Sequence, residues 1–165
     1  MKTIRFTVPG NPVGKQRPRF DSRSRRTYTP EKTVDYENLV ALMAGGSARG
    51  DMLQGPISME IRVYFPIPKS TSKKRRKELA EEKVWHTKKP DLDNVIKAIS
   101  DGSSGIAFRN DSQISRITAV KYYSEDPRVE VKMEEMGEGE DSEEEESEAL
   151  SGHQGSTEKH QGREN

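Results

Sequence analysis

The sequence contains no cysteine, which excludes disulfide bonds, thiolate metal sites and thiol nucleophiles. It also lacks any apolar run close to the roughly 20 residues of a membrane-spanning helix, and its first residues do not form the apolar core of a secretory signal. We therefore expect a cytoplasmic protein with no membrane partner. Histidine is scarce: only His86 lies outside residues 137–165, and a lone histidine is more often structural than a ligand. Any metal must bind through oxygen or imidazole.

Neither sign of charge is in excess overall, but the two signs are divided along the chain. Residues 1–136 contain 26 Lys and Arg against 18 Asp and Glu, a formal charge of +8. Residues 137–165 contain 2 against 10, a formal charge of −8. A basic body favours a polyanionic partner, and nucleic acid is the commonest candidate.

The acidic segment 137–165 contains four consecutive glutamates, Glu143–Glu146, many Ser and Gly, and few apolar residues. Such a composition cannot bury enough apolar surface to offset the entropy of ordering, so we expect a disordered tail after a domain at 1–136. One hypothesis is that the tail competes with nucleic acid for the basic body. Passive solubilisation is the simpler alternative.

Alternating apolar residues predict four β-strands. We expect them at residues 2–8, at 56–66, around 114–122 and around 129–133. A turn at Glu125–Pro127 predicts that the last two strands pair with each other in an antiparallel hairpin.

Helical periodicity predicts an amphipathic helix over about 30–45, which Gly45 and Gly46 would end. A short helix is expected within 69–89, with Trp85 on its thin apolar side. A third helix should begin at Asp93 or Asn94, after Pro90, and run to about Gly102. Together these elements predict an α/β (α+β) fold: a small mixed four-stranded sheet with helices packed on it.

The third predicted helix carries a charged stripe. Asp93, Lys97 and Asp101 are spaced by four residues and therefore share one side of the helix. Asp91 precedes them and Asp111 follows in the next loop. Aspartates from separated elements suit Mg²⁺, which prefers oxygen ligands, and Mg²⁺ assists phosphodiester cleavage. The alternative is structural: the aspartates cap the helix, and Lys97 pairs with Asp93 and Asp101.

Basic residues gather in two further segments, a loop expected from Gly14 to Tyr28 and a run of five from Lys73 to Lys77. Basic loops with interleaved aromatics can follow a phosphate backbone and stack on exposed bases. A solvated surface is the alternative for both segments. The candidate DNA contacts are Lys15, Arg17, Arg19, Arg23, Arg25, Arg26, Lys73, Lys74, Arg75, Arg76 and Lys89.

The stretch Lys89–Asp101, together with Gly105-Ile106 and Asn110–Ile114, resembles the signature of the RusA family of Holliday junction resolvases, which phages and prophages often carry. The segments Pro9–Phe20 and Tyr28–Pro30 are also similar to the phage-type branch. The resemblance covers about residues 3–134 and is most specific in the middle of the chain.

This resemblance implies an intertwined homodimer that makes paired symmetric nicks in four-way DNA junctions, in recombination and repair, in the cytoplasm of a bacterium or a phage-infected cell. It implies Mg²⁺ as the cofactor, with Mn²⁺ as an alternative. By position, the metal ligands are Asp91, Asp93 and Asp111, the catalytic lysine is Lys97, and the supporting residues are Asn94, Asp101 and Asn110. Two residues depart from the family pattern: Ser103 replaces an apolar residue and Asn110 a common Asp. A decayed relative that binds branched DNA without cutting it is the rival interpretation.

Overall fold

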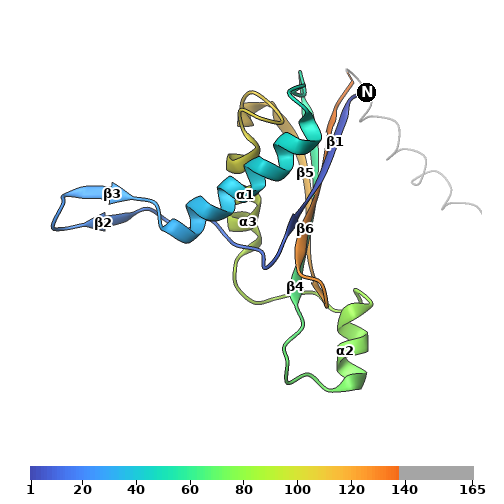
Figure 1. The fold of residues 1–165 in the computed structure, drawn as a ribbon. Coiled ribbons are helices and arrows are strands. Elements are labelled where there is room, and N and C mark those ends of the chain that lie inside the picture. Colours follow the sequence, from blue (N-terminus) through green and yellow to red (C-terminus); the bar gives the residue numbers. More distant parts are fainter. Residues whose placement is uncertain (138–165) are drawn as a thin grey trace, which may run out of the picture.

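A mixed four-stranded sheet with helices on one face forms the body of the protein (Figure 1). The computed structural model describes residues 1–137. The strands are β1 (Thr3–Pro9), β2 (Arg19–Asp21), β3 (Arg26–Tyr28), β4 (Ile57–Pro66), β5 (Ile114–Ser124) and β6 (Arg128–Glu135). The helices are α1 (Glu31–Ala48), α2 (Lys73–Ala80) and α3 (Leu92–Ser103), and a short 3-10 helix, η1, spans Asp111–Gln113. The predicted fold class is confirmed.

The strand order in the sheet is β1-β6-β4-β5, with β4 and β5 parallel and the other neighbours antiparallel. The predicted hairpin between the last two strands is therefore wrong. The turn after β5 carries the chain past the end of β4, where the Arg128 guanidinium lies 4.0 Å from the Tyr64 ring centroid. A short connection favours neighbouring strands only as a tendency, and here β6 fills the place between β1 and β4.

The core lies between the sheet and the pair α1 and α3. Alternate residues of β1, β4 and β6 face these helices and are buried, as the period of two predicted. The two helices cross at Gly102, where an added Cβ would lie 2.7 Å from the Val40 Cβ and 2.8 Å from the Glu37 carbonyl oxygen. Only glycine permits this close approach.

The predicted end of helix α1 at Gly45 and Gly46 is wrong, because the helix continues to Ala48. Ala44 and Ala48 are buried on the core side, and this packing offsets the cost of about 1 kcal/mol for each helical glycine. Arg49, the residue after the helix, has a left-handed backbone (φ 50°) and caps it.

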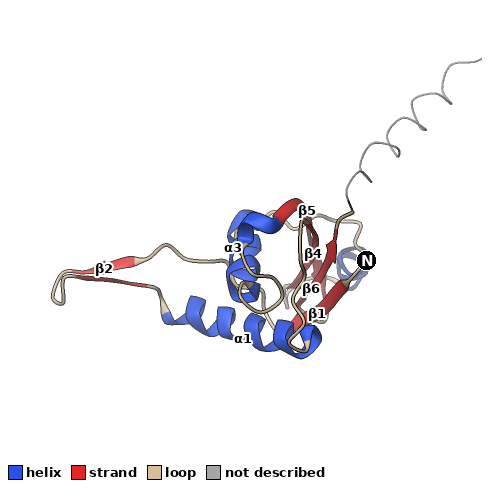
Figure 2. Ribbon diagram, turned by 90° about the horizontal axis from the view of Figure 1, so that it is seen from above, coloured by secondary structure: helices blue, strands red, loops and turns tan. Residues whose placement is uncertain are grey.

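The expected basic loop from Gly14 to Tyr28 contains a two-stranded hairpin, β2–β3, which projects from the body beyond the first turn of α1 (Figures 1 and 2). Helix α2 lies at the end of the sheet where β4 finishes (Figure 1), and the Ser72 side chain caps it. Trp85 lies outside this helix and is 61% exposed, so its predicted place on an apolar helix side is wrong.

None of the helices within residues 1–137 combines the length and apolar character that a membrane span needs. The acidic tail predicted at 137–165 lies, apart from residue 137, outside the described residues.

Candidate functional site

The N-terminus of α3 presents two carboxylates to solvent. The helix begins at Leu92, slightly earlier than predicted, with Asp91 at the N-cap position and Asp93 in the first turn. Val95, Ala98 and Ile99 are buried against the core, which turns the charged side of the helix outward. The Asp91 side chain makes no capping hydrogen bond, so the structural interpretation of this aspartate as a cap does not apply.

A cleft of about 620 Å³ opens beside this helix end. The segment before the hairpin forms its other wall: the Lys15 amide donates to the Asn94 carbonyl oxygen at 2.9 Å. Gly14 lies against the same helix end, where an added Cβ would be 2.8 Å from the Pro90 Cβ and 3.1 Å from the Asn94 Cβ. The cleft is lined by Pro12, Val13, Gly14, Lys15, Gln16, Arg17, Lys32, Lys89, Pro90, Asp91, Asp93 and Asn94.

Asp93 and Lys97 are exposed, and no side chain of the described residues forms a hydrogen bond or an ion pair with either. Lys97 lies one turn beyond Asp93 on the same helix but does not line the cleft. The pairing of Lys97 with Asp93 and Asp101, which the structural alternative required, is absent from residues 1–137. Two carboxylates and one ammonium group are thus left available to a ligand.

Asp101 has a different role, because it is bound by Lys15. The Lys15 ammonium contacts both Asp101 of α3 and, at 3.0 Å, the Glu37 carboxylate of α1. Its hydrogen bond to Asp101 raises the pKa of Lys15 above the usual range for lysine. Lys15, a predicted DNA contact that lines the cleft, therefore joins the two helices, and Asp101 and Glu37 offset its charge.

Lys121 of β5 supports the residues before Asp91 and was missed by sequence reasoning. Its ammonium donates to the carbonyl oxygens of Lys88 at 2.6 Å and Pro90 at 2.8 Å. Burial lowers the pKa of Lys121, while the charge of Asp91 acts in the opposite direction. A single lysine in a strand pattern gives no signal of such a contact.

His86 holds the same segment from the core side. Its ring stacks on Phe65 at 3.9 Å between centroids and lies 4.8 Å from Tyr123. Burial, reinforced by the charges of Lys121 and Lys88, lowers the pKa of His86 to about 4. The expected structural role of this histidine agrees with its neutral, packed ring.

Asp111 lies at the other end of α3 from Asp91 and Asp93. The C-terminal end of α3 contacts Phe108, which precedes Asp111 by three residues, and α3 is about 18 Å long at 1.5 Å per residue. On β5, Lys121 beside Pro90 stands seven residues beyond Ile114, about 23 Å at 3.3 Å per residue. Asn110 caps η1 by accepting from the Ser112 amide at 2.9 Å. One chain therefore does not bring the three predicted aspartates together.

Asp91 and Asp93 are placed to bind one metal ion together, whereas Asp111 of the same chain is not placed to join them. Within residues 1–137, no group of three His, Asp or Glu side chains is placed to hold a metal ion. Asp91 and Asp93 line one cleft and have open, solvent-facing oxygens. Two carboxylates, completed by water and substrate phosphate, are a common set for Mg²⁺.

The predicted DNA contacts fall into three places. Arg17 and Lys89 line the cleft, joined by Lys32, which the sequence reasoning did not single out. Four arginines lie on the projecting hairpin or its turn, and four basic residues lie on α2. On α2, Arg75 pairs with Glu78 and Arg76 with Glu125. These positions are Arg19, Arg23, Arg25 and Arg26, and Lys73, Lys74, Arg75 and Arg76.

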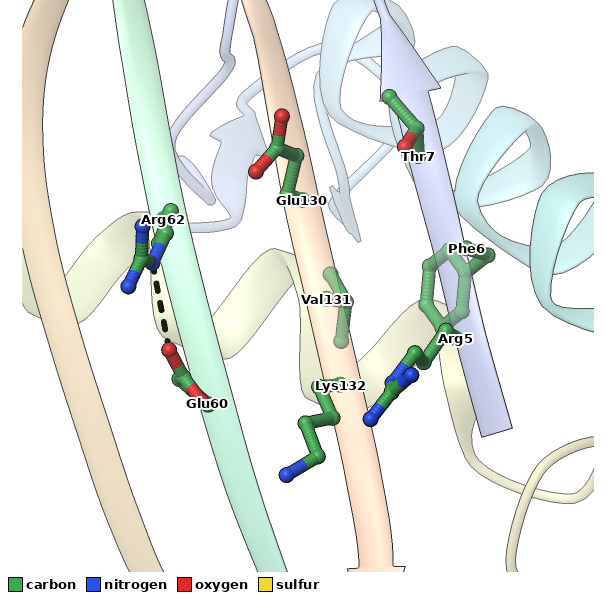
Figure 3. A pocket seen from close by; sticks show the side chains of 8 residues that line it. All are labelled: Arg5, Phe6, Thr7, Glu60, Arg62, Glu130, Val131 and Lys132. Atoms are coloured by element: carbon green, nitrogen blue, oxygen red, sulfur yellow. Dashed lines mark hydrogen bonds and ion pairs between the residues drawn. The ribbon is translucent and has the colours of Figure 1, made fainter. Parts of the chain in front are cut away.

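A second hollow, of about 340 Å³, lies on the open face of the sheet (Figure 3). It carries charges of both signs, including an ion pair of 3.2 Å between Arg62 and Glu60. None of the predicted site residues lines it. The cleft at the N-terminus of α3 is therefore the better candidate site.

Comparison with known proteins matches the chain to a protein family and to a bacterial relative. A model of the family described as endodeoxyribonuclease RusA matches residues 9–134. The chain is also similar to a Bacillus subtilis (strain 168) protein described as uncharacterized protein YqaN, with 39% identity over 140 residues that cover 82% of this chain and 99% of the relative. The family match spans the cleft, the hairpin and Asp111.

Proposed function

Because the chain belongs to the RusA endodeoxyribonuclease family, we propose that it is a Mg²⁺-dependent nuclease that resolves four-way DNA junctions by paired nicks. The observation that carries this proposal is the pair of exposed carboxylates, Asp91 and Asp93, in a cleft whose walls also present Arg17, Lys32 and Lys89. Cations attract the phosphate backbone, and the carboxylates would hold the metal beside it.

In this proposal each side chain has a defined task. Asp91 and Asp93 would hold Mg²⁺, which would offset charge on the phosphate and favour deprotonation of the attacking water. Lys97, one turn from Asp93 and without a side-chain partner among residues 1–137, would neutralise charge that develops on the phosphate oxygens. Arg17, Lys32 and Lys89 hold the neighbouring phosphates.

The position of Asp111 supports a homodimer with shared sites. Asp111 follows the segment at the C-terminal end of α3, whereas Asp91 and Asp93 of the same chain lie at its N-terminal end. In a two-fold dimer, Asp111 of each chain would complete the site that the other chain begins. Two such sites would face opposed strands of one junction, which suits paired symmetric cuts.

Mixing two inactive variants tests this arrangement. We expect Asp93→Asn and Asp111→Asn each to abolish nicking of a labelled four-way junction. After the two proteins are unfolded and refolded together, a shared site predicts that mixed dimers regain one intact site and nick one strand. If each site lay within one chain, every site in the mixture would carry one defect and activity would not return.

The rival function is a branched-DNA-binding protein without nuclease activity. It is favoured by Asn110, which replaces a common family Asp, and by the absence of a three-carboxylate group within residues 1–137. Incubating a labelled junction with the wild-type protein, with and without Mg²⁺, separates the two. Binding without Mg²⁺-dependent cleavage would favour the rival.

A further inference from the structure

The segment between α2 and α3 crosses the edge strand β5 at Trp85 and His86. The His86 amide donates to the Lys121 carbonyl oxygen at 3.2 Å, which fixes the crossing point. His86 lies on the core side against Phe65 and Tyr123. Trp85 lies on the other side and stacks on Tyr122, with 5.3 Å between ring centroids and 21° between ring planes. Neighbouring residues thus lie on opposite faces of one strand.

Trp85 is supported from one side only. Tyr122 lies 5.9 Å from the Tyr64 ring, and the Tyr64 hydroxyl donates to the Glu82 carboxylate at 3.0 Å. Tyr64 is almost fully buried under the Arg128 guanidinium. These contacts hold the Tyr122 ring in place, whereas Trp85 remains 61% exposed. A large aromatic ring is therefore fixed in orientation with a surface open to solvent.

This aromatic pair and the candidate active site lie on opposite faces of the edge strand β5, at neighbouring residues of that strand. Tyr122 follows Lys121, whose ammonium binds the carbonyl oxygens of Lys88 and Pro90 directly before Asp91. Lys88 and Lys89 are exposed in the same segment, and Lys89 lines the cleft. A DNA strand with a phosphate in the cleft would have its neighbouring nucleotides near β5.

We propose that Trp85, backed by Tyr122, is a stacking site for the exposed face of a nucleobase at the branch point of the DNA substrate. Aromatic side chains bind bases through their π-faces without regard to sequence, and bases at an open branch point lack the stacking neighbour that a continuous duplex provides. The site would thus contribute to selection for branched over linear DNA. This inference rests on the proposed nuclease function and adds a specificity residue to it.

Trp85 is the only tryptophan in the chain, so its fluorescence reports on this site alone. The experiment titrates wild-type protein in EDTA with a four-way junction, a single-stranded oligonucleotide and a linear duplex. We expect the junction and the single strand to quench the emission and the duplex to leave it nearly unchanged. Junction binding that leaves the emission unchanged would overturn the proposal.

Substitution separates stacking from charge. Trp85→Ala should weaken junction binding by about 5- to 150-fold, while Trp85→Phe should retain most of the affinity. Stacking releases no counterions, so Trp85→Ala should leave the salt dependence of binding unchanged, whereas Arg17→Ala should reduce the slope of log affinity against log salt by about 0.9. Leu42→Ala is the matched control, since Leu42 is 70% exposed on α1.

Three outcomes contradict the inference in different ways. Equal junction affinity of Trp85→Ala and wild type would overturn the stacking site and leave the nuclease proposal intact. A Trp85→Ala protein that is monomeric by light scattering while wild type is dimeric would assign the residue to a protein interface. Failure of the wild type to bind any branched DNA would overturn the proposed function and the stacking site together.

Discussion

Both ends of helix α3 carry aspartates, but those at the N-terminal end face solvent and the one at the C-terminal end is paired with a lysine. At the N-terminal end, Asp91 and Asp93 face an open cleft. At the C-terminal end, Asp101 is held by Lys15, and Gly102 presses against α1. The carboxylate with a protein partner stabilises the fold, and the carboxylates turned to the cleft are free to bind a metal. Local interactions, more than residue type, thus distinguish Asp101 from the two aspartates that we propose as metal ligands.

The largest expected effect compares Asp93→Asn with Asp101→Asn. Asp93→Asn removes a proposed metal ligand and should lower Mg²⁺-dependent junction nicking by more than about 100-fold, while junction binding in EDTA remains. Asp101→Asn should keep nicking close to wild type and lower the free energy of unfolding by about 1 kcal/mol, because it weakens the Lys15 ion pair. If Asp93→Asn and Asp101→Asn lowered nicking equally, Asp101 would be as important for cleavage as Asp93, and the contrast between the two ends of α3 would be wrong.

Lys121→Met tests what positions the N-terminal end. The substitution leaves the carbonyl oxygens of Lys88 and Pro90 without their donor, so the approach to Asp91 should loosen. We expect about a 10-fold rise in the Mg²⁺ concentration for half-maximal nicking. Lys132→Met, on the opposite face of the sheet, is the control. If Lys121→Met left the Mg²⁺ requirement unchanged, Lys121 would have no part in positioning Asp91.

Two glycines, one at each end of the helix, give a smaller and more selective test. Gly102→Ala forces a Cβ against Val40 and should lower the free energy of unfolding by about 1–3 kcal/mol, measured by urea titration. Gly14→Ala forces a Cβ against Pro90 and Asn94 and should instead raise the Mg²⁺ requirement. If Gly14→Ala affected stability alone, the cleft wall would have no part in metal binding.

The smallest expected effect concerns pH. The pKa of His86 is lowered to about 4 from an ordinary 6.5, so the unfolded chain binds more protons than the folded protein between these values. Its contribution to stability is therefore fully present above pH 6.5 and is lost as the pH falls towards 4. His86→Phe, which keeps a flat ring without titration, should flatten this part of the stability profile in urea unfolding. An unchanged slope in the variant would assign the acid sensitivity to other groups.

The sequence predicted the elements of the fold better than their arrangement. Periodicity located β1, β4 and β6 because one face of each strand packs on the core, whereas β5 lies at the edge of the sheet and buries only Tyr123. It could not show that β6 lies between β1 and β4, since pairing partners are chosen by tertiary packing. The glycines of α1 were misread for the same reason: burial of Ala44 and Ala48 outweighs local propensity.

The site was predictable where its residues are close in sequence. Asp93, Lys97 and Asp101 are spaced by four residues, so their shared side of the helix followed from spacing alone, and Asp91 lies two residues before Asp93. The separation of Asp111 from them depends on the path through Phe108 to β5, which spacing does not reveal. Lys32, Lys121 and the stacked pair of Trp85 and Tyr122 come from elements that meet only in the folded protein.

The length of strand β5 sets the distance between Asp111 and the residues before Asp91. The strand begins just after Asp111, and its eighth residue, Lys121, reaches the carbonyl group that precedes Asp91. In a dimer with shared sites, its length would set the distance between the two scissile positions. Removing one pleat, two residues, would shorten that distance by about 6.6 Å while keeping every side chain on its own face of the sheet. The spacing of the two nicks would then be a property of the sheet rather than of the catalytic residues.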